Sequence, residues 1–219
     1  MISQIREPLS KLAQPIIIFF AKMKIHPTVF TYIGLLLSVG AGVFLAYENP
    51  LVGFIFIWFA GAMDFVDGGV ARYRGLDSKK GSFIDSVIDR VSDLAVFTGI
   101  IFSDWVDGVT GGIMVGSALL ISYVRAKGES VGVERMTVGI MERAERWMVL
   151  MVLLFVAVIV PNQAFITERW LIAGEPISYF SLGYMILTAL CVLTVLQRFI
   201  YVSIQLKKAE PSQEVQVQK

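Results

Sequence analysis

The sequence predicts an all-α integral membrane protein with six transmembrane helices, preceded by an N-terminal juxtamembrane amphipathic helix. Two observations predict this fold class. First, 56% of the 219 residues are hydrophobic and 17% are charged, whereas soluble domains carry about 25% charge. Second, the apolar residues form six long runs, and about 20 apolar residues make a helix that crosses a hydrocarbon core roughly 30 Å thick.

The six runs are the candidate transmembrane helices. They lie at about 28–47, 51–71, 82–102, 109–125, 147–160 and 177–206. The fifth run is short and the sixth is long. We expect one membrane domain over 1–208, with all six spans within 27–206.

The two ends of the chain differ from the spans. In 1–25, apolar residues such as Ile2, Ile5 and Leu9 recur at three- and four-residue spacing, which predicts a helix lying in the membrane interface. The tail 209–219 has almost no apolar content and is expected to be disordered.

Basic residues predict the orientation in the membrane. Of the 19 Lys and Arg residues, all but Arg90 and Arg169 fall at one side of the predicted spans. Because cytoplasmic loops are enriched in Lys and Arg, we expect a multi-pass protein of the cell membrane with both termini and the active site facing the cytoplasm. The net charge of +1 gives no reason to expect nucleic acid as a partner.

Spans two and three contain the carboxylates Asp64, Asp67, Asp85 and Asp89. Each would cost about 2.5–3.5 kcal/mol at the centre of a spanning helix. The spacings i, i+3 and i, i+4 place each pair on one helical face, and the short connection at 73–80 makes the two helices antiparallel neighbours. The four carboxylates are therefore expected to meet near the cytoplasmic ends of these helices.

This acidic cluster predicts a metal site. The chain has one cysteine and one histidine, so a cysteine-based metal site and a Ser-His-Asp triad are both disfavoured. Oxygen ligands alone select hard divalent ions such as Mg²⁺, Mn²⁺ or Ca²⁺. Two ions would neutralise the four carboxylates and attract a phosphate group. Asp93, one turn further along, could support a metal ligand or serve only in packing.

The acids belong to a longer pattern, in which Gly68 and Gly81 leave room for a ligand. This pattern resembles, at all eight fixed positions, the motif of the CDP-alcohol phosphotransferase family: Asp64-x2-Asp67-Gly68-x2-Ala71-Arg72-x8-Gly81-x3-Asp85-x3-Asp89. The resemblance implies a core of six spanning helices. It also implies transfer of a phosphatidyl-type group from a CDP-lipid to an alcohol, with release of CMP.

The resemblance also implies residue roles. Two ions, Mg²⁺ or Mn²⁺, would be bound by Asp64, Asp67, Asp85 and Asp89, and Asp89 would be the general base. The CDP pocket would comprise Thr31, Asp67, Gly68, Ala71, Arg72, Gly81 and Asp85. A homodimer is a further family expectation.

The acceptor alcohol is predicted from basic residues. Arg125 and Arg198 lie in apolar helical context and need a partner, which an acceptor phosphate would supply. The surrounding segments resemble those of the inositol-phosphate-using branch of the family. In that branch the residues matching Arg125, Arg143 and Arg198 hold the phosphate, with Lys127 and Arg146 nearby. The partners implied are inositol 1-phosphate and either CDP-diacylglycerol or CDP-archaeol; glycerol 3-phosphate, as in phosphatidylglycerophosphate synthases, is the next acceptor candidate.

Two other classes of function fit the sequence less well. A divalent-cation transporter also uses intramembrane acids, but it predicts acids along the whole membrane depth, and the segments 51–58 and 94–102 have none. An inactive scaffold is disfavoured because all eight motif positions are intact.

Overall fold

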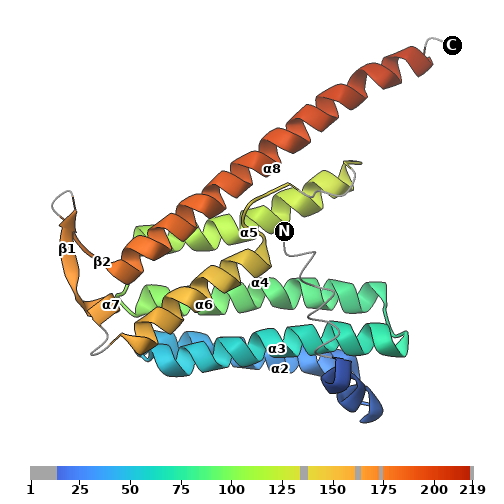
Figure 1. Cartoon of the computed structure of the whole chain (residues 1–219). Coiled ribbons are helices and arrows are strands. Elements are labelled where there is room, and N and C mark those ends of the chain that lie inside the picture. Colours follow the sequence, from blue (N-terminus) through green and yellow to red (C-terminus); the bar gives the residue numbers. More distant parts are fainter. Residues whose placement is uncertain (1–13, 134–137, 161–163, 173–174, 218–219) are drawn as a thin grey trace.

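The structure is a computed structural model that describes residues 14–133, 138–160, 164–172 and 175–217 (Figure 1). It is dominated by long helices, as the sequence predicts. Of the expected interfacial helix 1–25, residues 14–22 are helical, and residues 1–13 lie outside the described part. Ile17 and Ala21 are buried in a cluster with Phe30, Val66 and Val70.

The first three long helices are α2 (Pro27–Ala46), α3 (Pro50–Arg74) and α4 (Lys79–Phe102), and α2 packs against both of the others. Local sequence explains where they begin and end. Asn49 caps α3 by accepting a hydrogen bond from the Val52 amide, and Ser78 caps α4 in the same way at Gly81. Gly75 ends α3 in the left-handed conformation, with φ of 63°. These signals make the tight connection that sets α3 and α4 antiparallel.

The second half of the chain contains α5 (Gly108–Ser130), α6 (Arg143–Ile159), α7 (Ala164–Thr167) and α8 (Tyr179–Val217). Helix α5 packs against α4 and α8, and α6 packs against α3 and α8. Helix α6 begins four residues before the predicted span, so its first turn carries the charged segment of Arg143 and Arg146. Helix α8 extends away from the other helices towards the C-terminus (Figure 1).

Two details differ from the sequence prediction. An antiparallel hairpin of β1 (Arg169–Ile172) and β2 (Glu175–Ser178) precedes α8, so Ile177 lies in a strand and not in the sixth span. Such a short apolar stretch does not distinguish strand from helix. The backbone of α8 is helical to Val217, where composition predicts disorder; the segment follows an established helix, whose propagation is easier than its nucleation.

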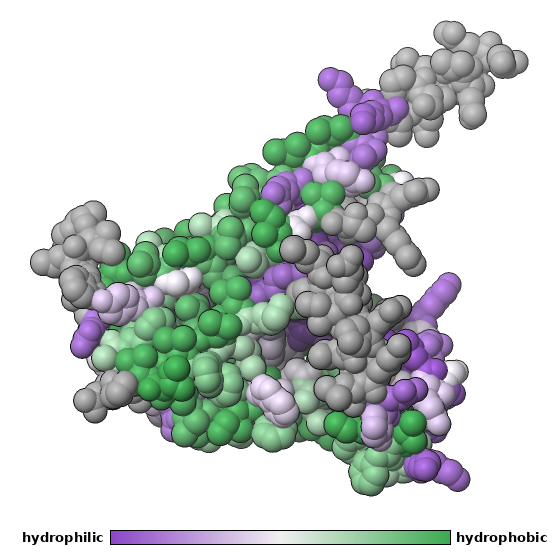
Figure 2. All heavy atoms as spheres, in the orientation of Figure 1, coloured by the Kyte–Doolittle hydropathy of each residue, from purple (hydrophilic) through white to green (hydrophobic). Residues whose placement is uncertain are grey.

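The chain is a multi-pass membrane protein by the length and composition of its helices. Four described helical segments have at least 18 residues and sufficient hydropathy to cross a membrane: Pro27–Ala46, Pro50–Arg74, Gly108–Ser130 and Tyr179–Lys208. Helices α6 and α4 are not among these four, because α6 has 17 residues and α4 carries several charged residues, including Asp85 and Asp89. Large apolar side chains such as Leu36, Phe102 and Val152 are exposed. They form broad hydrophobic areas on the surface, while hydrophilic residues gather where α3 joins α4 (Figure 2).

Helices α2 and α4 cross in direct backbone contact at Gly42 and Gly99. A Cβ atom at Gly42 would lie 2.3 Å from the carbonyl oxygen of Ala95, and one at Gly99 would lie 2.1 Å from that of Gly42. No side chain fits at either position. The crossing lies at the opposite end of these helices from the acidic residues.

Candidate active site

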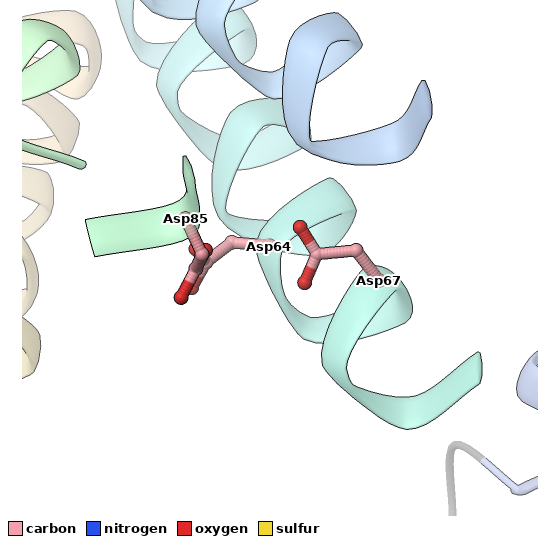
Figure 3. Close-up of side chains that lie close together, drawn as sticks. All are labelled: Asp64, Asp67 and Asp85. Carbon is pink, nitrogen blue, oxygen red and sulfur yellow. The ribbon is translucent and has the colours of Figure 1, made fainter. Parts of the chain in front are cut away.

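Three carboxylates from two helices meet, as the sequence predicts. Asp64 and Asp67 come from α3 and Asp85 from α4, and one oxygen of each lies within 4.8 Å of the others (Figure 3). Asp67 is buried, whereas the side chain of Asp64 is 44% exposed. The group is therefore open on one side and anchored on the other.

These residues fit a divalent cation. All three offer oxygen, which Mg²⁺ and Mn²⁺ prefer. Oδ1 of Asp85 is buried and has no hydrogen-bond partner among the described residues. A buried carboxylate oxygen without a partner is costly, and a cation between the three acids would supply that partner.

The third helix of the site, α2, contributes Thr31. Its hydroxyl donates a hydrogen bond of 2.7 Å to Oδ2 of Asp67, and both residues are buried. The bond fixes the direction of that carboxylate. Thr31 was expected in the CDP pocket, and the structure brings it directly onto one of the predicted metal ligands.

Asp89, the fourth predicted metal ligand, has a different partner. Its Oδ1 lies 2.8 Å from Nη1 of Arg143, and the same Nη1 lies 3.3 Å from Oδ1 of Asp64. Arg143 thus brings a cation from α6 to the edge of the acidic group. A residue expected at the acceptor phosphate therefore touches the predicted general base.

A small cavity lies among these side chains, between α2, α3, α4 and α6. Its volume is about 10 Å³, and its polar lining includes Thr31, Asp64, Asp67, Asp89 and Arg143. Such a cavity has room for one water-sized group. The predicted base and metal ligands thus share one confined space.

The remaining residues expected around CDP lie one to five positions from the acids, on the side of the connection of α3 and α4. The guanidinium of Arg72 lies over Gly68, with Nη1 3.3 Å from where a Cβ would stand. Gly81 is part of the first turn of α4, beside the hydroxyl of Ser78. Arg72 is exposed and Ala71 is half-buried, so this part of the surface is open to a ligand.

The other residues expected at the acceptor phosphate are spread more widely. Arg125 is 46% exposed and pairs with Glu129 at 3.1 Å, and Lys127 is exposed. Arg198 is 2% exposed. It donates to the carbonyls of Ile121 and Val138 and to the carboxylate of Glu142, at 2.8, 2.9 and 3.1 Å.

These contacts correct one step of the sequence argument. Arg125 and Arg198 were expected to need an external anion because they lie in apolar helical runs. Both have partners within the chain: Arg125 because its side chain reaches Glu129, and Arg198 because it donates to α5 and to the segment 138–142. Among the five basic residues, Arg143 is the one whose contacts include predicted metal ligands.

A comparison with protein families matches the model described as CDP-alcohol phosphatidyltransferase to residues 24–204. The chain belongs to this family. It is therefore a transferase of substituted phosphate groups, which removes the transporter as an alternative.

Individual relatives point to one branch of the family. The chain is 31% identical to archaetidylinositol phosphate synthase of Methanothermobacter thermautotrophicus over 94% of this chain and 96% of that protein. It is 33% identical to phosphatidylinositol phosphate synthase of Cutibacterium acnes over 92% and 97%.

Solved structures of a phosphatidylinositol phosphate synthase are also similar to this chain. The crystal structure of Mycobacterium tuberculosis phosphatidylinositol phosphate synthase with CDP-DAG bound is similar with a TM-score of 0.72 and 27% identity, over 88% of this chain and 94% of that one. The same enzyme in complex with manganese and citrate gives a TM-score of 0.70 and 28% identity, over 86% and 87%.

The role of one further residue of this site does not follow from the sequence. Asp93 is 4% exposed and accepts hydrogen bonds from Arg143, Arg146 and Trp147 of α6. Arg146, expected at the acceptor phosphate, is 1% exposed and directed at Asp93. The available signal was the spacing of Asp93 along the acidic face of α4, but the sequence does not show which helix packs there.

Proposed function

We propose that this enzyme transfers a phosphatidyl-type group, diacylglycerol phosphate or archaeol phosphate, from a CDP-lipid to the hydroxyl of inositol 1-phosphate and releases CMP. The observation that carries the proposal is the contact of Arg143 with Asp89 and Asp64, at 2.8 and 3.3 Å. This contact places a guanidinium, which can bind a phosphate, beside the acids of the family's motif. The names of the relatives support the choice of inositol phosphate.

The donor side of the reaction is assigned to the acids. Asp64, Asp67 and Asp85, whose oxygens lie within 4.8 Å of one another, hold divalent ions together with Asp89. The number of ions is two by charge balance, and the ligand type favours Mg²⁺ or Mn²⁺. When bound, these ions neutralise the diphosphate of the CDP-lipid and polarise its phosphoryl oxygens. Thr31 fixes Asp67, and Gly68, Ala71, Arg72 and Gly81 line the CDP pocket beyond the acids.

The chemical step needs a base and no covalent nucleophile. The carboxylate of Asp89 accepts the proton of the acceptor hydroxyl, and the hydroxyl oxygen bonds to the lipid-side phosphorus of the diphosphate. The bond between that phosphorus and the bridging oxygen breaks, and CMP leaves with the electron pair. Nη1 of Arg143 holds Oδ1 of Asp89 at 2.8 Å, and we assign the proton to Oδ2, which lies 3.9 Å from Nη1 of Arg90.

The acceptor side is assigned first to Arg143. A guanidinium presents a planar set of donors that matches a phosphate, and that of Arg143 lies beside the predicted base. Arg125, Lys127 and Arg198 are assigned to the outer part of the acceptor site. Arg146 is buried on Asp93, and we assign it to support of Arg143 in place of direct phosphate contact.

The proposal also includes the arrangement of the enzyme in the membrane. Residues 1–208 form one membrane domain, in which α4 and α6 span the membrane together with the four more apolar helices. The basic residues at one side favour an active site and termini in the cytoplasm. A homodimer is proposed from the family.

An acceptor panel tests the function. Purified enzyme in mixed micelles with Mg²⁺ is given CDP-diacylglycerol or CDP-archaeol and, separately, inositol 1-phosphate, inositol, glycerol 3-phosphate or serine. Mass analysis is expected to find a lipid product with inositol 1-phosphate, and CMP in equal amount. A product formed mainly with glycerol 3-phosphate would overturn the acceptor assignment. Asp89→Asn is expected to abolish the product, whereas Asp104→Asn, at an exposed acid beyond the other end of α4, retains it.

A further inference from the structure

One buried carboxylate joins α4 to the first two turns of α6. Oδ1 of Asp93 accepts from Nε1 of Trp147 at 2.6 Å and from Nε of Arg143 at 3.3 Å. Oδ2 accepts from Nη2 of Arg146 at 2.7 Å. Asp93 is therefore the point at which three donors of α6 converge.

The two edges of the Arg143 guanidinium have different partners. Nε faces Asp93, whereas Nη1 faces Asp89 and Asp64. The ring of Trp147 supports the same guanidinium at 5.0 Å from its centroid. An arginine side chain has many rotamers, and contacts at Nε and on the face of the guanidinium restrict it to the one that directs Nη1 to the site.

We propose that Asp93 is a positioning residue, which orients Arg143 so that its Nη1 edge faces the acceptor phosphate and Asp89. The inference rests on the proposed function, because it concerns the residue assigned to that phosphate. It differs from the two roles that the sequence left open, support of a metal ligand and packing alone, because Asp93 acts on Arg143. Both oxygens of Asp93 are occupied by donors of α6, whereas Oδ1 of Asp85 has no hydrogen-bond partner. Asp93 is thus distinct from the metal ligands.

Arg146 makes this arrangement possible. It is 1% exposed, and its charge balances that of Asp93. A buried carboxylate without a cation would be strongly unfavourable, and a free one would compete with Asp89 for Arg143. Because Asp93 pairs with Arg146, Arg143 can contact both Asp93 and Asp89.

The test is a double-mutant cycle of Asp93→Asn and Arg143→Gln, with the KM for inositol 1-phosphate, the KM for CDP-lipid and kcat measured for each enzyme. Arg143→Gln is expected to raise the acceptor KM by about 10- to 100-fold, and Asp93→Asn by about 5- to 20-fold. The CDP-lipid KM stays within about twofold. In the double variant the acceptor KM equals that of Arg143→Gln alone, because Asp93 then has no guanidinium to orient.

Two controls separate positioning from folding. Asp93→Asn leaves Arg146 without an anion, so Asp93→Asn with Arg146→Gln removes both charges and is expected to reproduce the acceptor KM of Asp93→Asn. Ser103→Ala removes another buried hydrogen bond of α4, from Ser103 to the carbonyl of Ile100. It is expected to leave the acceptor KM unchanged.

The outcomes distinguish the inference from the function on which it rests. If the wild type makes no product with inositol 1-phosphate, the proposed function fails. If Arg143→Gln raises the acceptor KM but Asp93→Asn does not, or if the two effects multiply in the double variant, only the positioning role is overturned. An unchanged acceptor KM in Arg143→Gln overturns it as well.

Discussion

The hydroxyl of Thr31 lies 2.7 Å from Oδ2 of Asp67 and donates a hydrogen bond to it, joining α2 to the acidic group of α3 and α4. Thr31→Val keeps the shape of the side chain and removes this donor. Because a hydrogen bond to a charged group contributes about 1.5–3 kcal/mol, we expect the Mg²⁺ concentration for half-maximal activity to rise roughly tenfold or more. A Mg²⁺ titration of activity measures it. Thr31→Ser, which retains the hydroxyl, is expected to behave like the wild type, and equal effects of the two variants would contradict this role.

Removal of divalent ions is expected to abolish activity. EDTA treatment should stop CMP release, and addition of Mg²⁺ or Mn²⁺ should restore it, since the three acids offer only oxygen. Asp85→Asn is expected to lower kcat by at least about 100-fold, because the loss of a metal ligand exceeds the effect of losing its supporting partners. Asp104→Asn serves as the matched exposed control. Full activity in EDTA would refute metal dependence.

Arg198 is expected to stabilise the fold at the junction of three segments. Three separate nitrogens of the Arg198 guanidinium donate to Ile121, Val138 and Glu142, and the single nitrogen of a lysine in Arg198→Lys cannot lie at all three positions. We expect the thermal midpoint to fall by at least about 5 °C, because buried carbonyl groups lose their partners. Arg125→Lys, at an exposed pair with Glu129, should change it by about 1 °C or less. Similar midpoints for both variants would show that the buried contacts contribute little.

The crossing of α2 and α4 predicts a difference between two glycines. Gly42→Ala places a Cβ against the carbonyl of Ala95, whereas at Gly116 the added Cβ meets nothing within 4 Å. Overpacking costs about 1–3 kcal/mol, so the thermal midpoint of Gly42→Ala should fall by several degrees. Gly116→Ala should be neutral or stabilising, because alanine is the better helix former. Unfolding in detergent followed by circular dichroism compares the two.

The pH dependence of stability is expected to include Asp107. It caps α5 by accepting the Thr110 amide at 2.8 Å, and hydrogen bonds with Thr110 lower the pKa of this carboxyl. The stabilisation by the ionised group is therefore complete above the unfolded pKa of about 3.9, and it is lost as pH falls through the lower folded value. Asp107→Ala should lower the thermal midpoint at pH 7, and its difference from the wild type should shrink below about pH 4. Asp107→Asn, which caps without titrating, should retain stability at pH 7.

The acids of α3 and α4 show which features of the site can be predicted from local sequence. Helical spacing puts Asp64 and Asp67 on one face, and the short connection makes the next helix antiparallel, so the meeting with Asp85 was predictable from the sequence. Their neighbours depend on tertiary packing. Arg143 reaches Asp64 across 79 positions of the chain, and no periodicity predicts which face of α6 meets α4.

The same limit explains the other differences. Arg146 reads from the sequence as a basic residue at a helix end, and only the packing of α6 on α4 buries it on Asp93. Arg198 stands in an apolar run, and its partners are two carbonyl groups and the carboxylate of Glu142, all distant in the sequence, which sequence patterns do not reveal. The hairpin before α8 has too few residues for its period to be distinguished from that of a helix.

The backbone contact of Gly42 and Gly99 gives α2 and α4 a fixed pivot. Gly99 lies 14 residues from Asp85, so the lever arm along α4 is about 20 Å. A rotation of roughly 3° about the pivot moves the acid end by about 1 Å, a displacement large enough to change a rate by about 100-fold. We therefore expect the close contact of these two glycines, at the far end of the helices, to limit how far the reacting groups move relative to one another.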